Sequence, residues 1–210
     1  MTYAALGSRS DRTRALAALH REILACRRCP LWATRTQAVP GVGPTDARIM
    51  LVGEAPGREE DLKGEPFVGA AGRLLDTLLE SIGLSRGEVF ITNVVKSRPF
   101  VGPPPGRNRA PLGPEIAACR FWLDQQLRII RPQIVVPMGR VALEYFLPGA
   151  SISSVHGRPQ QGVECTILPL YHPAAALRGR RLRAVIERDF QVLRTLLRKK
   201  ATPRGKGRSW

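Results

Sequence analysis

Short apolar runs alternate along the chain with longer segments in which apolar residues recur every three or four positions. The longer segments predict helices over 12–28, 72–82, 114–130, 140–146 and 181–198. The short runs predict buried strands at 49–52, 89–92, 134–136 and 165–170. Strands that alternate with helices in this way indicate an α/β domain, whose mainly parallel sheet is covered by helices on both faces.

Unusual polar residues follow directly on three of the predicted strands. Glu54 lies in Gly53-Glu-Ala-Pro-Gly57 after the first strand, Asn93 follows the second, and His172-Pro173 follows the last. The carboxyl ends of parallel strands form the ligand crevice of open α/β sheets, so we expect these side chains to converge on one pocket. Each residue also has a structural alternative: Glu54 as a helix cap, Asn93 as a turn former and His172 as a buried structural histidine.

The chemistry of these side chains suits a small polar ligand. The carboxamide of Asn93 can donate and accept in one plane, as the edge of an amide-containing base requires. His172 can donate a hydrogen bond to a developing oxyanion. Phe67 lies in a glycine-bounded loop, where it is either a stacking platform or ordinary packing.

The charge balance points to a polyanionic partner. The chain of 210 residues has 33 Lys and Arg against 17 Asp and Glu, a net charge of +16, which favours nucleic acid or an anionic membrane surface. Twelve of the basic residues lie from Arg178 onward, on the basic face of the final helix and in a tail over 199–210 that we expect to be disordered. The alternative is a solvated helix face with a solubilising tail. No apolar run approaches a membrane span and 1–14 has no signal-like core, so we expect a soluble, cytoplasmic chain that associates with the nucleoid through DNA.

Four cysteines raise the question of a metal site. Cys26 and Cys29 have the two-residue spacing common in pairs of thiolates that bind one metal ion or cluster. Cys119 falls on a predicted helix and Cys165 in a predicted strand. In an intracellular chain, metal or iron-sulfur ligation is favoured over a disulfide, although buried free cysteines are also common and Cys165 fits the core better.

Four motifs, taken together and in order, resemble the family 4 uracil-DNA glycosylases, the iron-sulfur branch of that superfamily. They are Gly53-Glu-Ala-Pro-Gly57, Gly64-Glu-Pro-Phe-Val-Gly69 with Ala71-Gly-Arg-Leu-Leu75, Thr92-Asn-Val-Val-Lys96, and Tyr171-His-Pro173. The resemblance runs from about Cys26 to Arg198. It implies a three-layer α/β/α sandwich around a short, mainly parallel four-stranded sheet, as a single domain over 1–198.

The resemblance also implies an activity: a monofunctional enzyme everts deoxyuridine from DNA and hydrolyses its N-glycosidic bond, which releases uracil and leaves an abasic site. His172 would stabilise negative charge on uracil O2, and Glu54 would position or activate water or stabilise the cationic sugar. Phe67 would stack on the base and Asn93 would read its polar edge. The substrate pocket would be lined by Gly53, Ala55 and Gly57.

A structural iron-sulfur cluster, of the 4Fe-4S type, is implied as well, with Cys26, Cys29 and Cys119 as ligands. At the remaining ligand position, where the family usually has a cysteine, this chain has Ser97. The fourth ligand is therefore Ser97, a residue of the neighbouring loop, or Cys165 after rearrangement, or it is missing.

Two further departures concern DNA. The segment after Ser97 is expanded to Pro99-Phe-Val-Gly-Pro-Pro-Pro-Gly-Arg-Asn-Arg109, and the loop after His172 reads Ala174-Ala-Ala-Leu-Arg178 in place of a stronger wedge. We expect DNA contacts from Lys96, Arg98, Arg107, Arg109, Leu177 and Arg178. The weaker wedge favours uracil that is unpaired or mispaired, although both single- and double-stranded DNA are expected substrates.

Two other functions compete with a monomeric glycosylase. The first is a protein on the same scaffold that binds uracil-containing or abasic DNA with slow turnover. The second is a metal- or cluster-stabilised RNA-binding module without catalysis, for which Asn93 and His172 would be dispensable.

Overall fold

The computed structural model describes residues 8–177 and 179–199. Arg178 and most of the predicted basic tail, from Lys200 onward, lie outside the described residues. Within the described part of the chain, no helix is both long enough and apolar enough to cross a membrane.

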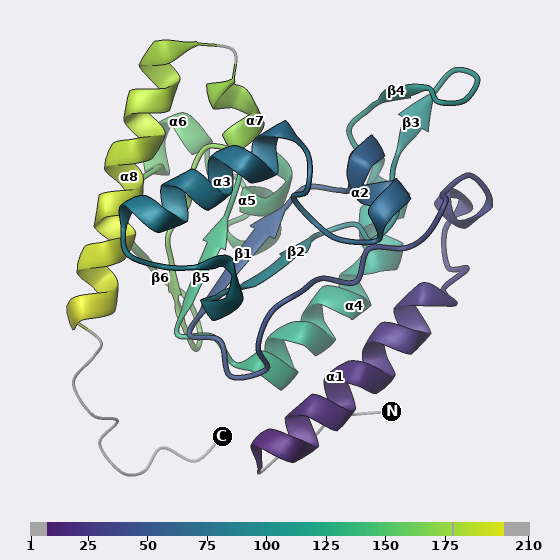
Figure 1. Cartoon of the computed structure of the whole chain (residues 1–210), viewed down its shortest axis with the longest axis horizontal. Helices are drawn as coiled ribbons and strands as arrows, with labels where there is room; N and C mark the ends of the chain where they lie inside the picture. The colour runs from purple at the N-terminus through teal and green to yellow at the C-terminus, as the bar shows by residue number, and fades with distance from the viewer. Residues whose placement is uncertain (1–7, 178, 200–210) are drawn as a thin grey trace.

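The sheet at the centre of the molecule has the strand order β2-β1-β5-β7-β6 (Figure 1). Its strands are β1 (Ile49–Gly53), β2 (Phe90–Asn93), β5 (Ile134–Pro137), β6 (Gln160–Gln161) and β7 (Thr166–Ile167). The first four strands of this order run parallel, and β6 joins the edge antiparallel to β7. The predicted mainly parallel sheet is confirmed, and the short strand β6 is an addition to the expected four.

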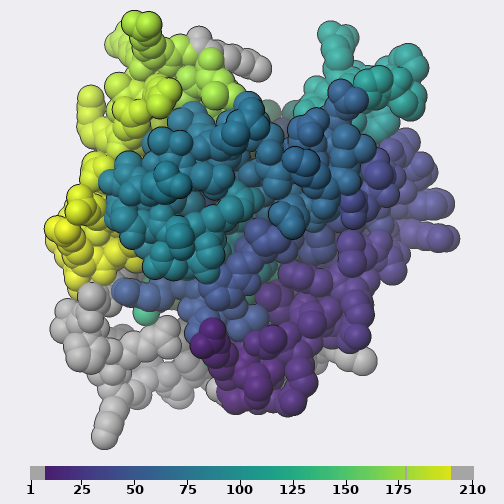
Figure 2. Space-filling view, viewed as in Figure 1, coloured from purple at the N-terminus to yellow at the C-terminus, as the bar shows by residue number. Residues whose placement is uncertain are grey.

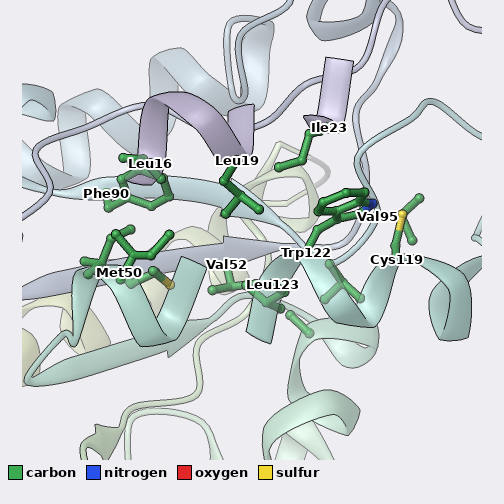
Figure 3. Packing of buried hydrophobic residues seen from close by; sticks show 14 of the residues in the cluster. Leu16, Leu19, Ile23, Met50, Val52, Phe90, Val95, Cys119, Trp122 and Leu123 are labelled. Carbon is green, nitrogen blue, oxygen red and sulfur yellow. The ribbon is translucent and has the colours of Figure 1, made fainter. Parts of the chain in front are cut away.

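Helices cover both faces of the sheet, as the continuous apolar strands require. Alternate residues of β1 enter two separate cores, with Met50 and Val52 on one side and Ile49 and Leu51 on the other. Figure 3 shows the first core, where α1 (Arg9–Leu24) and α4 (Gly113–Ile130) pack against the sheet. The second core lies beneath α3 (Ala70–Ser81) and α8 (Arg180–Lys199). The three-layer α/β/α architecture is therefore confirmed.

The first helix begins and ends earlier than predicted. It begins at a capping box, in which the Ser8 hydroxyl accepts from the Asp11 N–H at 3.1 Å and the Asp11 carboxylate accepts from the Ser8 N–H at 3.3 Å. Its buried stripe ends with Ile23, and the helix stops one residue later. The segment that contains Cys26 and Cys29 consequently lies outside the helix.

The basic final helix is present as predicted. Ile186, Phe190 and Leu193 are buried on one face of α8, while most of its arginines lie on the exposed face. This arrangement is the amphipathic pattern that the sequence indicates.

The expanded segment after Ser97 is not an irregular loop. It forms a small antiparallel hairpin, β3 (Phe100–Val101) and β4 (Arg107–Asn108), before α4 begins. Figure 2 shows this hairpin rising from the body of the molecule, with a recess between it and the segment that carries the C-terminal helices. The remaining elements are α2 (Arg58–Lys63), α5 (Arg140–Phe146), α6 (Ile152–Val155), α7 (Pro173–Ala176) and the 3-10 turns η1 (Pro30–Ala33) and η2 (Arg86–Glu88).

Candidate active site

A cavity of about 350 Å³ opens at the carboxyl ends of the central strands, between α2, α3 and α7. It brings together residues that are far apart in the sequence, as the positions after the strand ends predict. Its lining includes the sequence-predicted residues Ala55, Gly57, Phe67, Asn93 and His172.

Asn93 ends β2 at the wall of this cavity. Its side chain is 1% exposed, and its Oδ1 is buried without a hydrogen-bond partner among the described residues. Gly53 allows this approach, because a Cβ built there would overlap Asn93 Oδ1. A buried acceptor without a donor costs about 1–3 kcal/mol, so this oxygen is suited to a ligand N–H group.

Phe67 is held over the cavity by an unusual backbone. Its φ of 55° is in the left-handed region, which non-glycine residues rarely adopt. A Cβ at Gly72 would overlap the Phe67 carbonyl, and one at Gly53 would lie 2.7 Å from the ring. The ring stacks against His172 with centroids 5.4 Å apart and planes 25° from parallel. These contacts fix the ring before any ligand arrives.

His172 is positioned as a neutral hydrogen-bond donor. It caps α7, and its Nδ1 accepts from the Ala174 N–H at 3.1 Å, so the ring proton is on Nε2. Burial of the ring lowers the pKa of His172 to about 4. At neutral pH the imidazole therefore presents an N–H donor without a positive charge.

Glu54 is adjacent in sequence to the cavity lining but is not part of it. It follows β1 and is half-buried; among the described residues that line the cavity, its neighbour Ala55 is present and Glu54 is not. Burial raises the pKa of the Glu54 carboxyl, and the charge of Arg140 opposes this rise.

Glu60, which sequence reasoning missed, ties two lining loops together. Its Oε2 accepts from the Gly57 N–H at 3.1 Å, and its Oε1 accepts from the Val68 and Gly69 N–H groups at 3.0 Å each. Three bonds to main-chain donors satisfy this carboxylate and hold the loop that carries Phe67. The available sequence indication was a glutamate three residues after the glycine that precedes a helix, which is the spacing of a capping box.

Asn108 is a second residue of the lining that the sequence did not reveal. It lies on β4, and its Oδ1 accepts from Arg98 Nε at 2.7 Å. Its Nδ2 faces Gly57, at 3.2 Å from a Cβ built there. Arg98 also donates to the Gly106 carbonyl at 3.0 Å and lies over the Phe100 ring at 4.8 Å. The hairpin therefore delivers one amide to the cavity and is braced by a buried arginine.

Two expected DNA contacts are corrected by this arrangement. Lys96 is 2% exposed, and its Nζ donates to Thr92 Oγ1, the Asn93 carbonyl and Gln126 Oε1, each at 2.7 Å. Arg98 is 5% exposed and engaged with the hairpin. Because neither cation reaches the surface, both support the site from within and neither is placed to contact phosphate.

The other expected DNA contacts differ among themselves. Arg107 and Leu177 are exposed, the latter at 54%. Arg109 forms a two-pronged ion pair with Glu115, at 2.6 and 2.8 Å, which leaves it only partly available. Arg178 lies outside the described residues.

The cysteines of the predicted cluster gather near the start of α4. The Cys119 thiol donates to the sulfur of Cys29, which lowers the pKa of Cys29 to about 6 and raises that of Cys119. Cys26 contacts the next turn of α4 after Cys119, because its sulfur accepts from Trp122 Nε1 at 3.3 Å. The main chain of Lys96 also bonds to Cys119. We name Cys26, Cys29, Ser97 and Cys119 the cysteine corner.

The fourth position of the cysteine corner is engaged by an arginine. Arg35 Nη1 donates to Ser97 Oγ at 2.9 Å, and Nη2 donates to the Leu24 carbonyl at 2.8 Å. Cys165 lies elsewhere, in a cavity wall with Leu127 near the other end of α4. Over 8–177 and 179–199, no three His, Cys, Asp or Glu side chains are arranged to hold a metal ion. Cys26, Cys29 and Cys119 are of the residue type that binds zinc ions or iron-sulfur clusters.

Comparison with known proteins agrees with this site. Residues 40–194 match the uracil DNA glycosylase superfamily. The chain is 44% identical over 208 residues to a type-4 uracil-DNA glycosylase of Sulfurisphaera tokodaii, covering 90% of each chain. It is 46% identical over 189 residues to the type-4 uracil-DNA glycosylase of Archaeoglobus fulgidus, covering 86% of this chain and 92% of that one. A type-5 uracil-DNA glycosylase of Thermus thermophilus is 35% identical over 133 residues, which is 56% of each chain.

These matches span most of the chain and include the strand-end motifs that build the cavity. The chain therefore belongs to the uracil DNA glycosylase superfamily and, within it, to the type-4 uracil-DNA glycosylases.

Proposed function

We propose that the chain is a uracil-DNA glycosylase that everts deoxyuridine from DNA and hydrolyses its N-glycosidic bond. One observation carries the proposal: an unsatisfied acceptor on Asn93 and a neutral donor on His172 face the same small cavity. Uracil carries an imide N–H and carbonyl oxygens, which match an acceptor and a donor respectively.

Recognition of the base rests on Phe67 and Asn93. The fixed ring of Phe67 offers an apolar face against which a planar base can stack. The Asn93 amide then pairs with the imide edge, with Oδ1 accepting the N–H. A base reaches this cavity only after leaving the helical stack, at a cost of a few kcal/mol.

His172 addresses the charge on the departing base. As the glycosidic bond breaks, electron density moves onto uracil, and the Nε2–H group of His172 stabilises it at a carbonyl oxygen. A single preorganised donor of this kind contributes about 3–4 kcal/mol to the transition state.

The other half of the reaction concerns the sugar and the attacking water, and we assign it to Glu54 and Asn108. The sugar develops positive charge, which a carboxylate at Glu54 stabilises, and the attacking water needs a hydrogen-bond partner near the cavity. The Nδ2 group of Asn108 is a polar group of the wall suited to holding that water. We assign Glu54 to the sugar cation and Asn108 to the water.

The DNA partner is held by exposed cations on both sides of the cavity. Arg107 on the hairpin and the outer arginines of α8 supply phosphate affinity that falls with salt. Leu177, exposed beside the cavity, is the candidate wedge into the base stack. We propose a monomer that acts on single- and double-stranded DNA, with a preference for unpaired or mispaired uracil.

A structural iron-sulfur cluster forms part of the proposal. Cys26, Cys29 and Cys119 would hold it, with Ser97 at the fourth position in place of a cysteine. When bound, the cluster supplies a rigid tie between the segment after α1 and the start of α4, and no chemistry at the base. Iron and sulfide analysis of anaerobically purified protein, together with its visible absorption, tests this: zinc or no metal would refute it.

The decisive experiment is uracil release. A labelled oligonucleotide with uracil opposite G, opposite A or unpaired is incubated with the protein and then heated in alkali, which cleaves abasic sites. We expect strand scission with multiple turnovers and none with thymine in place of uracil. Tight binding without turnover would favour the alternative, a protein that only holds uracil-containing or abasic DNA.

A further inference from the structure

Trp32 is an exposed indole at the edge of the molecule. It lies in η1 and is 43% exposed, whereas the ring of Trp122 is buried. The guanidinium of Arg27 lies over the Trp32 ring, 4.8 Å from its centroid. An exposed aromatic ring paired with arginine is a typical surface for stacking nucleic acid bases.

The segment that carries Trp32 is braced on both sides. Leu31, beside it, is buried in the core, and the Thr34 N–H donates to the Leu31 carbonyl at 3.3 Å. Arg35 joins the segment to the end of α1 at Leu24 and to Ser97. The ring is consequently displayed on a firm support, so a ligand that stacks on it does not first have to order the segment.

The segment that leads from the end of α1 to Trp32 carries both cations and exposed apolar surface. Arg28 lies over the rings of Phe121 and Trp122, at 4.9 and 5.7 Å from their centroids. Leu24, at the end of α1, is 49% exposed. We name Leu24, Arg27, Arg28 and Trp32 the Trp32 ledge. A strand of nucleotides matches the Trp32 ledge, since its bases stack on apolar surface and its phosphates neutralise arginine.

The Trp32 ledge is connected to the active-site cavity through α2. The Thr36 N–H donates to both carboxylate oxygens of Asp61, at 3.1 and 3.0 Å, and Gln37 Nε2 donates to the Leu62 carbonyl at 2.7 Å. The opposite end of α2 lines the cavity with Arg58. In Figures 1 and 2 the segment after α1 lies on the same side of the molecule as α2 and the β3–β4 hairpin.

We propose that the Trp32 ledge binds an unpaired nucleotide of the DNA strand that flanks the everted deoxyuridine, with its base on Trp32 and its phosphates beside Arg27 and Arg28. This inference rests on the proposed function for the presence of DNA in the cavity. It makes the ledge a determinant of substrate form, because a base in a duplex is already stacked and gains nothing from Trp32.

The test is the binding of a uracil-free, fluorescently labelled single strand to the full chain, measured by anisotropy. Trp32→Ala is expected to weaken binding by about 5- to 150-fold, the range for loss of one base–aromatic stack. Trp32→Phe should retain most of the affinity. Val163→Ala is the matched control, because Val163 is fully exposed on the β6–β7 turn, away from the cavity. It should change nothing.

Two comparisons make the result unambiguous. Trp32→Ala should leave the maximal rate of uracil release from duplex DNA unchanged while it raises KM for single-stranded substrate. Affinity for the single strand within twofold of the unaltered protein would overturn the proposal and leave the ledge to a protein partner. Because the binding strand contains no uracil, this outcome is independent of whether the chain releases uracil.

Discussion

The active-site cavity and the cysteine corner lie at opposite ends of one short stretch, Asn93 to Ser97, yet they treat polar groups in contrasting ways. At the cavity end, Asn93 Oδ1 is buried and has no partner among the described residues. At the other end, the Ser97 hydroxyl accepts from Arg35. The cavity keeps an acceptor that no described residue satisfies, whereas the Ser97 hydroxyl of the cysteine corner already has a donor.

The contrast separates two uses of buried polarity. An unsatisfied buried group reduces the stability of the free protein, and it contributes favourable free energy only when it bonds to a bound substrate. A satisfied group ties segments together, as the contact between Cys29 and Cys119 joins the loop after α1 to α4. Lys96, between the two ends, supports both, because its ammonium bonds to the Asn93 carbonyl and its main chain bonds to Cys119.

The largest effect is expected from loss of the donor in the cavity. His172→Ala should slow uracil release by about 100- to 1,000-fold, because it removes the group that stabilises charge on the leaving base. Single-turnover rates at saturating protein measure this, and the melting temperature checks that the fold is intact. A loss of less than about fivefold would contradict the role assigned to His172.

The next effect concerns acid pH. Burial raises the pKa of Glu54 above its ordinary 4.5, whereas the pKa of His172 is lowered to about 4. As pH falls, the Glu54 carboxylate is therefore protonated first, and the rate of uracil release should decline while His172 is still neutral.

Glu54→Gln should be slower at pH 8 and should lose this acid limb. Rates of the two proteins between pH 5 and pH 8, at constant ionic strength, make the comparison. Parallel profiles would show that another group is titrating.

Between Asn93 and Ser97, Lys96→Met tests whether the buried hydrogen bonds of Lys96 stabilise the protein. The substitution leaves the acceptors on Thr92, Asn93 and Gln126 without their donor, which should lower the free energy of unfolding by at least about 2 kcal/mol. Urea denaturation measures this loss. The salt dependence of DNA binding should not change. A shallower dependence would show that Lys96 contacts a DNA phosphate after all.

The smallest effect is expected at the rim. Arg107→Ala should leave stability unchanged and reduce the slope of log affinity against log salt concentration by about one, as for loss of one phosphate contact. Arg48→Ala is a suitable control, since Arg48 is exposed and directly precedes β1, at the end of the strand opposite to the cavity. Equal changes in both variants would mean that the effect reflects net charge and is not local to the hairpin.

The architecture was predictable wherever apolar periodicity extends over several residues. The strands β1, β2 and β5 and the helices α3, α4, α5 and α8 lie within two residues of their predicted positions. The hairpin β3–β4 and the strand β6 were missed because each strand has two residues, too few to show alternation. Their pairing depends on turns and partners that no local pattern encodes.

The site was predictable where a residue type is unusual for its position. The strand-end positions pointed to Asn93 and His172, which the cavity brings together. The family pattern could not reveal that Lys96 is buried, since its acceptor Gln126 is 30 residues away. Asn108 was hidden for a similar reason, because only the hairpin carries it to the cavity.

The backbone of Phe67 orders its ring before a planar base binds. A left-handed backbone costs a non-glycine residue about 1–2 kcal/mol, and this cost is met once, when the polypeptide folds. A pyrimidine that enters the cavity then stacks on a ring that is already ordered, and its binding does not have to immobilise that ring. The left-handed φ of Phe67 is therefore set during folding, so that ordering of its ring costs no further free energy when a damaged base binds.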